Sequence, residues 1–214
     1  MSMTISDLRK DYSAQSLLES DVAPDPIQQF GKWWEQAVNS QIEEPNAMTI
    51  ATASCDGLPS ARIVLLKGFD KNGFTFFTNY KSYKAMQLEE NPRACLVFFW
   101  KELERQVRIV GLVKKTSEEE SDAYYNSRPK TSRIGAIASP QSQVIESREW
   151  IDKKYLEFSE TFKEKEPQRP EHWGGYIVQP IIAEFWQGRP SRLHDRMQYT
   201  LEDNGTWKIE RLAP

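Results

Sequence analysis

The sequence predicts a mainly β fold with peripheral α-helices, in which an antiparallel sheet closes into a barrel. Short β-rich runs are separated by the turn dipeptides Asp56-Gly57, Asn72-Gly73 and Asn204-Gly205, which favour tight hairpins. The expected order is a helix, five strands with a helix inserted, two helices and about three strands, unlike the alternation of a parallel sheet. Because closure removes exposed strand edges, a barrel is favoured for so many short strands.

The N-terminal part is expected to contain an arm and then a helix. Residues 1–23 lack sustained periodicity, so they predict an arm whose order depends on docking or ligand, ahead of a single domain at 24–214. Asp25 is a suitable N-cap, and Pro26 suits the first helical position. Pro45 sets the latest end of the helix, and one apolar face is expected to contain Ile27, Phe30, Trp34 and Ala37.

The remaining elements follow from periodicity and turn chemistry. Strands are expected from Ala47 to the Asp-Gly turn, between the first two turns, and at 74–79, 94–100 and 106–113, with a short helix after Ser82. Ser117 and Glu120 form a capping box for a helix that ends near Ser127, before Pro129. A long ordered loop is then expected at 130–147. A helix is expected at 147–165, with one apolar face made by Ile151, Tyr155, Phe158 and Phe162. The chain is expected to close with a strand region at 174–186, interrupted by Pro180, and a hairpin around Asn204-Gly205.

Composition excludes several classes of function. The 28 basic and 31 acidic residues give a net charge of -3, so no general attraction for nucleic acid or an anionic membrane is expected. No apolar run approaches the roughly 20 residues of a membrane helix, and the start has no apolar signal region, which favours a cytoplasmic location. Cys55 and Cys95 are expected to be unpaired thiols, and with only His172 and His194 they do not make a metal site.

The glycine pattern also limits how a phosphate could be bound. The ten glycines form neither a dinucleotide-binding motif nor a P-loop, and no nucleophile elbow is present. A phosphate must therefore be held by side chains.

The run RIVLLK (62–67) has a cation at each end of an apolar strand. Strand alternation places Arg62 and Lys67 on opposite faces. Solvation of both at the strand ends is the commoner outcome, so this signal is weak alone.

Tyr124, Arg128 and Ser132 recur at four-residue spacing just before SPQS (139–142). Hydroxyl and guanidinium donors suit a phosphate monoester. A polar loop that caps its own backbone is an equally simple explanation, and without context it is the favoured one.

Arg192, His194 and Arg196 would line one face if their segment is extended. Such crowding of cationic groups is costly unless an anionic or π-rich ligand is present. For this cluster a ligand-binding role is preferred to a solvated charged face.

Together, these motifs resemble the pyridoxine (pyridoxamine) 5'-phosphate oxidase family over nearly the whole chain. The resemblance is carried by RIVLLK (62–67), LERQV (103–107), SRP (127–129), SPQS (139–142), HWGG (172–175), and EFWQG with RLHDR (184–196). It implies a homodimeric split β-barrel that binds flavin mononucleotide (FMN). It also implies oxidation of pyridoxine and pyridoxamine 5'-phosphates by O2 to pyridoxal 5'-phosphate, with release of hydrogen peroxide, and of ammonia from the amine, after hydride transfer from C4' to flavin N5.

The resemblance assigns site residues by their place in these motifs. The implied cofactor site, with Arg62 and Lys84 at the flavin phosphate, comprises Arg62, Ile63, Val64, Leu65, Leu66, Lys67, Phe77, Thr78, Tyr83, Lys84, Gln106, Gln141, Ser142, Trp186 and Arg196. The substrate phosphate is expected to meet Lys67, Tyr124, Arg128 and Ser132. Arg192 and His194 are the implied catalytic pair that holds the pyridine ring over the flavin, and Arg9 and Tyr12 are expected to contribute a lid.

Two departures from the family pattern concern the cofactor phosphate. Phe77 stands where the family often has Tyr, and Tyr83 stands where Arg commonly precedes the phosphate-binding Lys84. One hydroxyl and one cation are therefore lost. Two alternatives are ranked lower: a non-catalytic split-barrel module that carries or senses flavin or pyridoxal phosphate, and a split-barrel reductase that uses another flavin-like cofactor with a nicotinamide donor.

Overall fold

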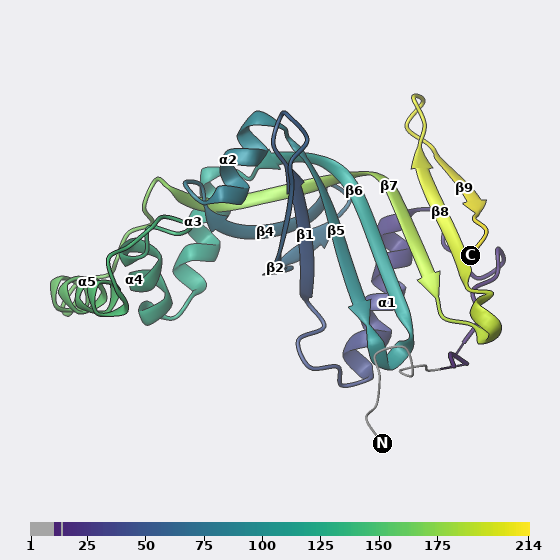
Figure 1. Ribbon diagram of the computed structural model, residues 1–214, viewed down its shortest axis with the longest axis horizontal. Coiled ribbons are helices and arrows are strands. Elements are labelled where there is room, and N and C mark those ends of the chain that lie inside the picture. The colour runs from purple at the N-terminus through teal and green to yellow at the C-terminus, as the bar shows by residue number, and fades with distance from the viewer. Residues whose placement is uncertain (1–10, 14) are drawn as a thin grey trace, which may run out of the picture. The chain divides into compact units, whose positions relative to one another are not determined.

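The computed structural model describes residues 11–13 and 15–214, which form nine strands and five α-helices (Figure 1). The strands are β1 (Ala47–Ala53), β2 (Pro59–Leu65), β3 (Gly68–Asp70), β4 (Gly73–Asn79), β5 (Arg93–Trp100), β6 (Arg105–Lys115), β7 (Trp173–Gln187), β8 (Asp195–Leu201) and β9 (Trp207–Arg211). The helices are α1 (Pro26–Asn39), α2 (Tyr83–Glu90), α3 (Glu118–Ser127), α4 (Lys130–Ala138) and α5 (Arg148–Thr161). None of the helices in this described part is long and apolar enough to cross a membrane.

The strands form one hydrogen-bonded path in the order β2-β1-β5-β6-β7-β4-β3, and β8 joins β7 and β9. Where β3, β4, β7, β8 and β9 pair, they pair antiparallel. Because β2 also contacts β4, the path curls back on itself. The prediction of a mainly β, antiparallel fold is confirmed.

Contacts divide the chain into two compact units. Unit 1 contains the described residues up to 50 together with 95–111 and 180–214, and unit 2 contains 51–94 and 112–179. Strands β1, β5, β6 and β7 each contribute residues to both units. The predicted division into an arm and a single domain stays a prediction.

The core of unit 1 is aromatic and is covered by α1. As predicted, the Asp25 carboxylate caps this helix by accepting the backbone N–H groups of Ile27 and Gln28. Phe30 and Trp33 are the buried aromatic residues of the helix, at 0% and 4% exposure. The sequence placed Trp34 on this face, but one residue of rotation brings Trp33 into the stripe with Pro26, Phe30 and Ala37.

Part of the predicted arm belongs to the fold of unit 1. The side chains of Leu17 and Ala23 are buried, at 3% and 2% exposure. The hydroxyl of Tyr199, itself fully buried in β8, donates to the carbonyl of Ala23 at 2.7 Å. Burial of these residues requires the segment that precedes α1 to pack on the C-terminal strands.

Strand β7 is continuous, whereas the sequence predicted an interruption at Pro180. Its first half pairs with β4 from Trp173 to Val178, and its second half pairs with β8 from Ile182 to Gln187. Pro180 lies between these two stretches. A residue without a backbone N–H is tolerated there because neither pairing needs its donor.

Helix α4 lies in the segment that the sequence predicted as a loop. The carbonyl of Pro129 accepts the backbone N–H groups of Ser132 and Arg133, so the helix starts where the proline ends α3. Ile134 and Ala138, one turn apart, are its buried residues and hold it in place. Only 139–146 stays without helix or strand before Ser147 caps α5, which ends at Thr161, short of the predicted 165.

Candidate active site

Unit 2 contains a cavity of about 730 Å3, within the usual size range of cofactor and substrate pockets. Its walls come from β2, β4, α2, α3, α4 and the start of β7. Three distant stretches of the sequence therefore converge here. The predicted site residues that line the cavity are Arg62, Ile63, Val64, Leu65, Lys67, Phe77, Thr78, Lys84, Tyr124, Arg128, Ser132 and Gln141.

Two cations, Arg62 and Lys84, line the wall formed by β2 and α2. Lys84 is 6% exposed, and its Nζ donates to the hydroxyls of Thr78 at 3.1 Å and Ser82 at 3.3 Å. Burial, and then the positive charge of Arg62, lower the pKa of Lys84 to about 8. Burial also lowers the pKa of Arg62, an effect that Tyr83 counteracts. An anion bound here would relieve the cost of both charges.

A second cationic group lies where α3 ends and α4 begins. The Nη1 atom of Arg128 is buried and has no hydrogen-bond partner within the described part of the chain. Burial lowers the pKa of Arg128. Ser132, in the first turn of α4, and Tyr124 line the same cavity, and a helix N-terminus adds partial positive charge. An orphaned buried donor beside these groups is suited to an anionic oxygen.

Aromatic rings form another part of the wall. The ring of Phe77 stacks on Tyr124 with centroids 4.0 Å apart and on Trp173 at 5.6 Å. The Arg128 guanidinium lies 4.7 Å from the Trp173 ring centroid. A Cβ atom on Gly175 would lie 2.8 Å from the Phe77 ring, so the absence of a side chain at this position allows the packing. Trp173 belongs to the HWGG motif, but it was not predicted as a cavity residue.

Within unit 2, three residues that the resemblance assigned to the cofactor do not line the cavity. Leu66 is buried at 5% exposure, Tyr83 is 42% exposed, and Ser142 is exposed with a φ of 69°. Gln141, next to Ser142, does line the cavity, where its side-chain oxygen accepts the Thr78 hydroxyl at 3.2 Å.

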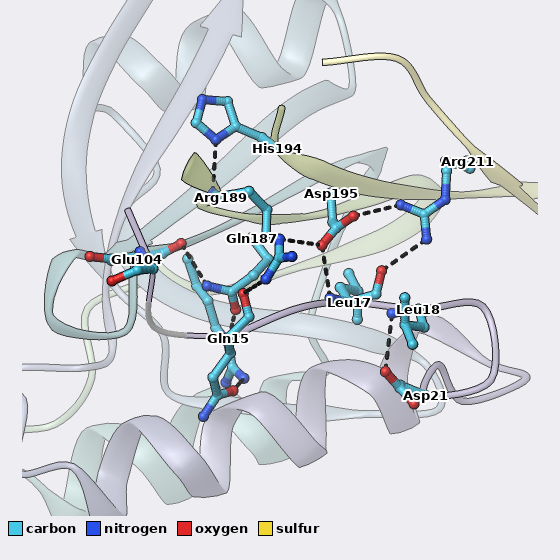
Figure 2. A network of polar contacts seen from close by, with 12 residues as sticks. Gln15, Leu17, Leu18, Asp21, Glu104, Gln187, Arg189, His194, Asp195 and Arg211 are labelled. Atoms are coloured by element: carbon cyan, nitrogen blue, oxygen red, sulfur yellow. Dashed lines mark hydrogen bonds and ion pairs between the residues drawn. The ribbon is translucent and has the colours of Figure 1, made fainter. Parts of the chain in front are cut away.

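A second group of predicted residues lies in unit 1, around His194 (Figure 2). The His194 ring centroid is 4.6 Å from that of Trp186 and 5.9 Å from that of Tyr12. Nδ1 of His194 accepts the backbone N–H of Arg189 at 3.1 Å. Burial, and then the charge of Arg192, lower the pKa of His194. His194 is therefore a neutral imidazole with its proton on Nε2, where it can donate to a ligand.

The prediction of an extended segment with Arg192, His194 and Arg196 on one face is wrong for Arg192. Pro190–Arg192 form a 3-10 turn in which Ser191 and Arg192 have φ values of 56° and 61°, and Arg192 is exposed. Strand β8 begins only at Asp195. Because Arg192 lies in this turn and not in the strand, the cationic crowding that the sequence suggested is reduced.

Arg196 has a carboxylate partner inside unit 1. Its Nε donates to Glu184 Oε1 at 2.8 Å and its Nη1 to the carbonyl of Ala213 at 2.8 Å. Glu184 is 3% exposed and also pairs with Arg108. Burial would raise the pKa of Glu184, but the hydrogen bond from Arg196 and the charge of Arg108 outweigh burial and lower it. A buried carboxylate, not only a ligand, therefore balances Arg196.

Gln15 and Leu17, which follow Tyr12 in the sequence, are tied to the loop that carries His194 (Figure 2). The backbone N–H of Leu17 donates to the Asp195 carboxylate at 3.0 Å, and the Arg189 side chain donates to the carbonyl of Gln15 at 3.2 Å. Gly188 is also required, because a Cβ atom there would lie 2.8 Å from Tyr12. These contacts position Tyr12 against His194.

Gln106 and Arg9 are the remaining residues of the predicted site. Gln106 is half-buried in β6, within unit 1. Arg9 lies outside the described residues. The roles assigned to all of these site residues stay predictions.

Comparisons with known proteins agree on one family. The family described as "Pyridoxamine 5'-phosphate oxidase" matches residues 34–162, and a "Pyridoxine 5'-phosphate oxidase C-terminal dimerisation region" matches residues 173–214. A Nostoc punctiforme protein named pyridoxine/pyridoxamine 5'-phosphate oxidase is 58% identical over 214 residues and 100% of both chains. A Paraburkholderia phymatum protein of the same name is 59% identical over 211 residues and 99% of both chains.

Solved structures support the same assignment. The crystal structure of PhzG from Burkholderia lata 383, in complex with tetrahydrophenazine-1-carboxylic acid, matches with a TM-score of 0.88 and 29% identity, over 94% of this chain and 100% of that one. A pyridoxamine 5'-phosphate oxidase-related, FMN binding protein from Nostoc punctiforme matches with a TM-score of 0.70 at 16% identity, over 90% of this chain and 100% of that one, which supports the split-barrel fold. The chain therefore belongs to the pyridoxamine 5'-phosphate oxidase family and is an oxidoreductase.

Proposed function

We propose that this enzyme uses FMN to oxidise pyridoxine 5'-phosphate and pyridoxamine 5'-phosphate with O2. The products are pyridoxal 5'-phosphate and hydrogen peroxide, with ammonia when the substrate is the amine. The observation that carries the proposal is one cavity lined by two pairs of cations, which suits two phosphorylated ligands. In the first region the charges of Arg62 and Lys84 interact, and in the second Arg128 and Lys67 both lie near Tyr124. None of the described residues that line it is Asp or Glu.

The residues at the first region fit the phosphate of FMN. Arg62 and Lys84 would hold it, and relief of the cost of burying Lys84 favours a dianion. Gln141 and Thr78, which are hydrogen bonded to each other, would contact the cofactor from the same wall. When bound, FMN supplies the acceptor for a hydride from the substrate C4' and then reacts with O2.

The second region fits the phosphate of the substrate. Arg128 offers a buried N–H without a partner in the described structure, and Ser132 and Tyr124 add hydroxyl groups. Lys67 is exposed, lines the same cavity and adds a positive charge. Binding of the phosphate would satisfy the orphaned donor, which costs about 1–3 kcal/mol while it is unpaired.

His194 and Arg192 would hold the pyridine ring. His194 is neutral, its Nε2 proton is available, and Tyr12 and Trp186 pack beside its ring. The family match to a dimerisation region at residues 173–214 covers this segment, so we propose a homodimer in which both chains build each site. Arg9 would extend the lid that Tyr12 begins.

The decisive experiment is an oxidase assay on the purified protein. Bound FMN is expected in the visible spectrum, and peroxide is expected on adding pyridoxine 5'-phosphate in air. Unphosphorylated pyridoxine is the matched control, and it should react far more slowly because it cannot use Arg128 and Lys67. Flavin binding without peroxide release would favour a carrier or sensor instead.

An Arg192→Ala variant tests the assignment of the pyridine-binding side. Arg192 is exposed and contributes no core packing, so the variant should keep its flavin. Turnover of pyridoxine 5'-phosphate should fall because the ring loses a cationic partner. Unchanged turnover would remove Arg192 from the site.

A second candidate substrate class is a tricyclic carboxylic acid. The PhzG structure with tetrahydrophenazine-1-carboxylic acid is similar to this chain, and the stacked rings of Phe77, Tyr124 and Trp173 offer an aromatic wall. The orphaned Arg128 donor favours a phosphate. Peroxide release with the tricyclic acid but not with pyridoxine 5'-phosphate would reverse this preference.

A further inference from the structure

A buried glutamine lies behind the cationic wall of the cavity. Gln87 is 2% exposed and does not line the cavity. It lies one turn after Lys84 on the buried face of α2. A buried amide needs partners for both its oxygen and its nitrogen, so its contacts report what it does.

The Gln87 side chain connects to Arg62 through two hydroxyl groups. Its Oε1 accepts the hydroxyls of Thr52 at 2.6 Å and Ser60 at 2.5 Å. In turn, the Thr52 hydroxyl accepts a hydrogen bond from Nη1 of Arg62 at 2.7 Å, and the Ser60 hydroxyl accepts one from Nη2 at 2.5 Å. Both terminal nitrogens of the guanidinium are thus held by hydroxyls that a single amide oxygen aligns.

The hydroxyl protons of Thr52 and Ser60 need an acceptor, and Gln87 provides it. A guanidinium only donates, so each hydroxyl must turn its one proton away from Arg62 in order to accept from it. Gln87 Oε1 takes the protons of Thr52 and Ser60 together. Without that acceptor, the hydroxyl protons have no fixed direction away from the guanidinium.

The orientation of the amide is fixed on its other side. Nε2 of Gln87 donates to the backbone carbonyl of Leu58 at 3.3 Å. A flipped amide would face this carbonyl with its oxygen and would direct its N–H groups at Thr52 and Ser60. Both hydroxyl protons would then lack their acceptor, and two oxygens would face each other at Leu58, so only one amide orientation satisfies all partners.

We propose that Gln87 is the positioning residue of the cofactor phosphate site. Through Thr52 and Ser60 it locks the guanidinium of Arg62 at the cavity wall, ready for the phosphate of FMN. The inference rests on the proposed function, and it adds a residue that contacts neither cofactor nor substrate. Preorganisation of the Arg62 donors is what such a residue would contribute to binding.

The test compares a Gln87→Met variant with the parent enzyme. Methionine has nearly the same length as glutamine but offers no strong acceptor. FMN binding should weaken roughly tenfold, the lower end of the range for a charge-assisted contact. Riboflavin, which lacks the phosphate, should bind both proteins equally. Flavin fluorescence quenching measures both affinities without turnover.

Gln29→Met is the matched control. Gln29 is also a buried glutamine, at 1% exposure, but in unit 1 its oxygen accepts the backbone N–H of Ala23. This variant should lose stability and keep its FMN affinity. If Gln29→Met weakens FMN as much as Gln87→Met does, the effect is general loosening and the proposal is wrong.

A variant that removes the hydroxyls tests the connection itself. Thr52→Val with Ser60→Ala should weaken FMN binding to a similar extent, and adding Gln87→Met should then have little further effect. Independent, additive losses would overturn the proposal. This hydroxyl variant also carries the test if Gln87→Met does not fold.

Failure of the inference can be told from failure of the proposed function. A parent protein that does not bind FMN contradicts the proposed function. A parent that binds FMN tightly, together with a Gln87→Met variant of equal affinity, contradicts only the role of Gln87.

Discussion

Replacement of Lys84 by methionine should make the enzyme without cofactor more stable and its binding of FMN weaker. Lys84 is 6% exposed, and burial with the charge of Arg62 moves its pKa from 10.5 to about 8. At about 1.36 kcal/mol per pH unit, the buried charge costs about 3.4 kcal/mol below pH 8. The hydrogen bonds to Thr78 and Ser82 offset about 1 kcal/mol. Methionine should thus raise the free energy of unfolding at pH 7 by about 2 kcal/mol.

The difference in unfolding free energy between Lys84→Met and the parent should depend on pH. Between pH 8 and 10.5 the unfolded chain binds more protons at Lys84 than the folded protein does, so stability of the parent rises with pH in this window. The stability difference between variant and parent should therefore change by about 2.5 kcal/mol between pH 7 and pH 10, so the advantage of the variant should be gone at pH 10. Urea unfolding of both proteins after removal of flavin, at several pH values in a buffer free of phosphate, measures this difference.

The same substitution should act in the opposite direction on the cofactor. A bound phosphate favours the charged form of Lys84, so the FMN affinity of the parent is full below pH 8 and falls as pH rises above it. The variant should bind FMN more weakly at pH 7 and lose this pH dependence. A Lys84→Met protein that is less stable at pH 7, with a difference constant to pH 10, would refute the reasoning.

Three further substitutions test other contacts. Arg128→Met should lower kcat/KM for pyridoxine 5'-phosphate by roughly 10- to 100-fold and leave FMN affinity unchanged, because it removes a charge-assisted phosphate contact; an equal loss with unphosphorylated pyridoxine would contradict this. Gly188→Ala should raise KM with flavin retained, because its Cβ would lie 2.8 Å from Tyr12; steady-state kinetics check this, and an unchanged KM would show that Tyr12 is not needed. Tyr199→Phe leaves the Ala23 carbonyl without its 2.7 Å donor and should cost about 1–3 kcal/mol in urea unfolding; no loss would mean that another donor replaces the hydroxyl.

Local chemistry accounts for the elements that the sequence predicted well. Asp25 and Pro26 define the start of α1 without help from the rest of the fold, and the Asn204-Gly205 turn lies in the β8 and β9 hairpin. Helix α4 was missed because the Ser, Arg, Gln and Pro content of 130–147 favoured a loop, while Pro129 was taken only as the end of the preceding helix. In the structure the same proline ends α3 and caps the next helix.

The candidate site was less accessible to local reasoning. The polar pattern of Tyr124, Arg128 and Ser132 alone favoured a loop that caps its own backbone, and the resemblance to a family supplied the site. Gln87 and Trp173 gave no local signal, since glutamine is common in helices and tryptophan is common in cores. Their contributions depend on strands and helices that meet only after folding.

The absence of carboxylates among the described cavity residues also matters at the bench. A wall of this kind does not discriminate strongly between one small oxyanion and another. Sulfate or phosphate from purification buffers would bind at Arg62, Lys84 and Arg128 and compete with FMN during reconstitution. Such binding would also raise the apparent stability of the flavin-depleted protein. Exchange into chloride or a zwitterionic buffer is therefore the sound starting point for any titration.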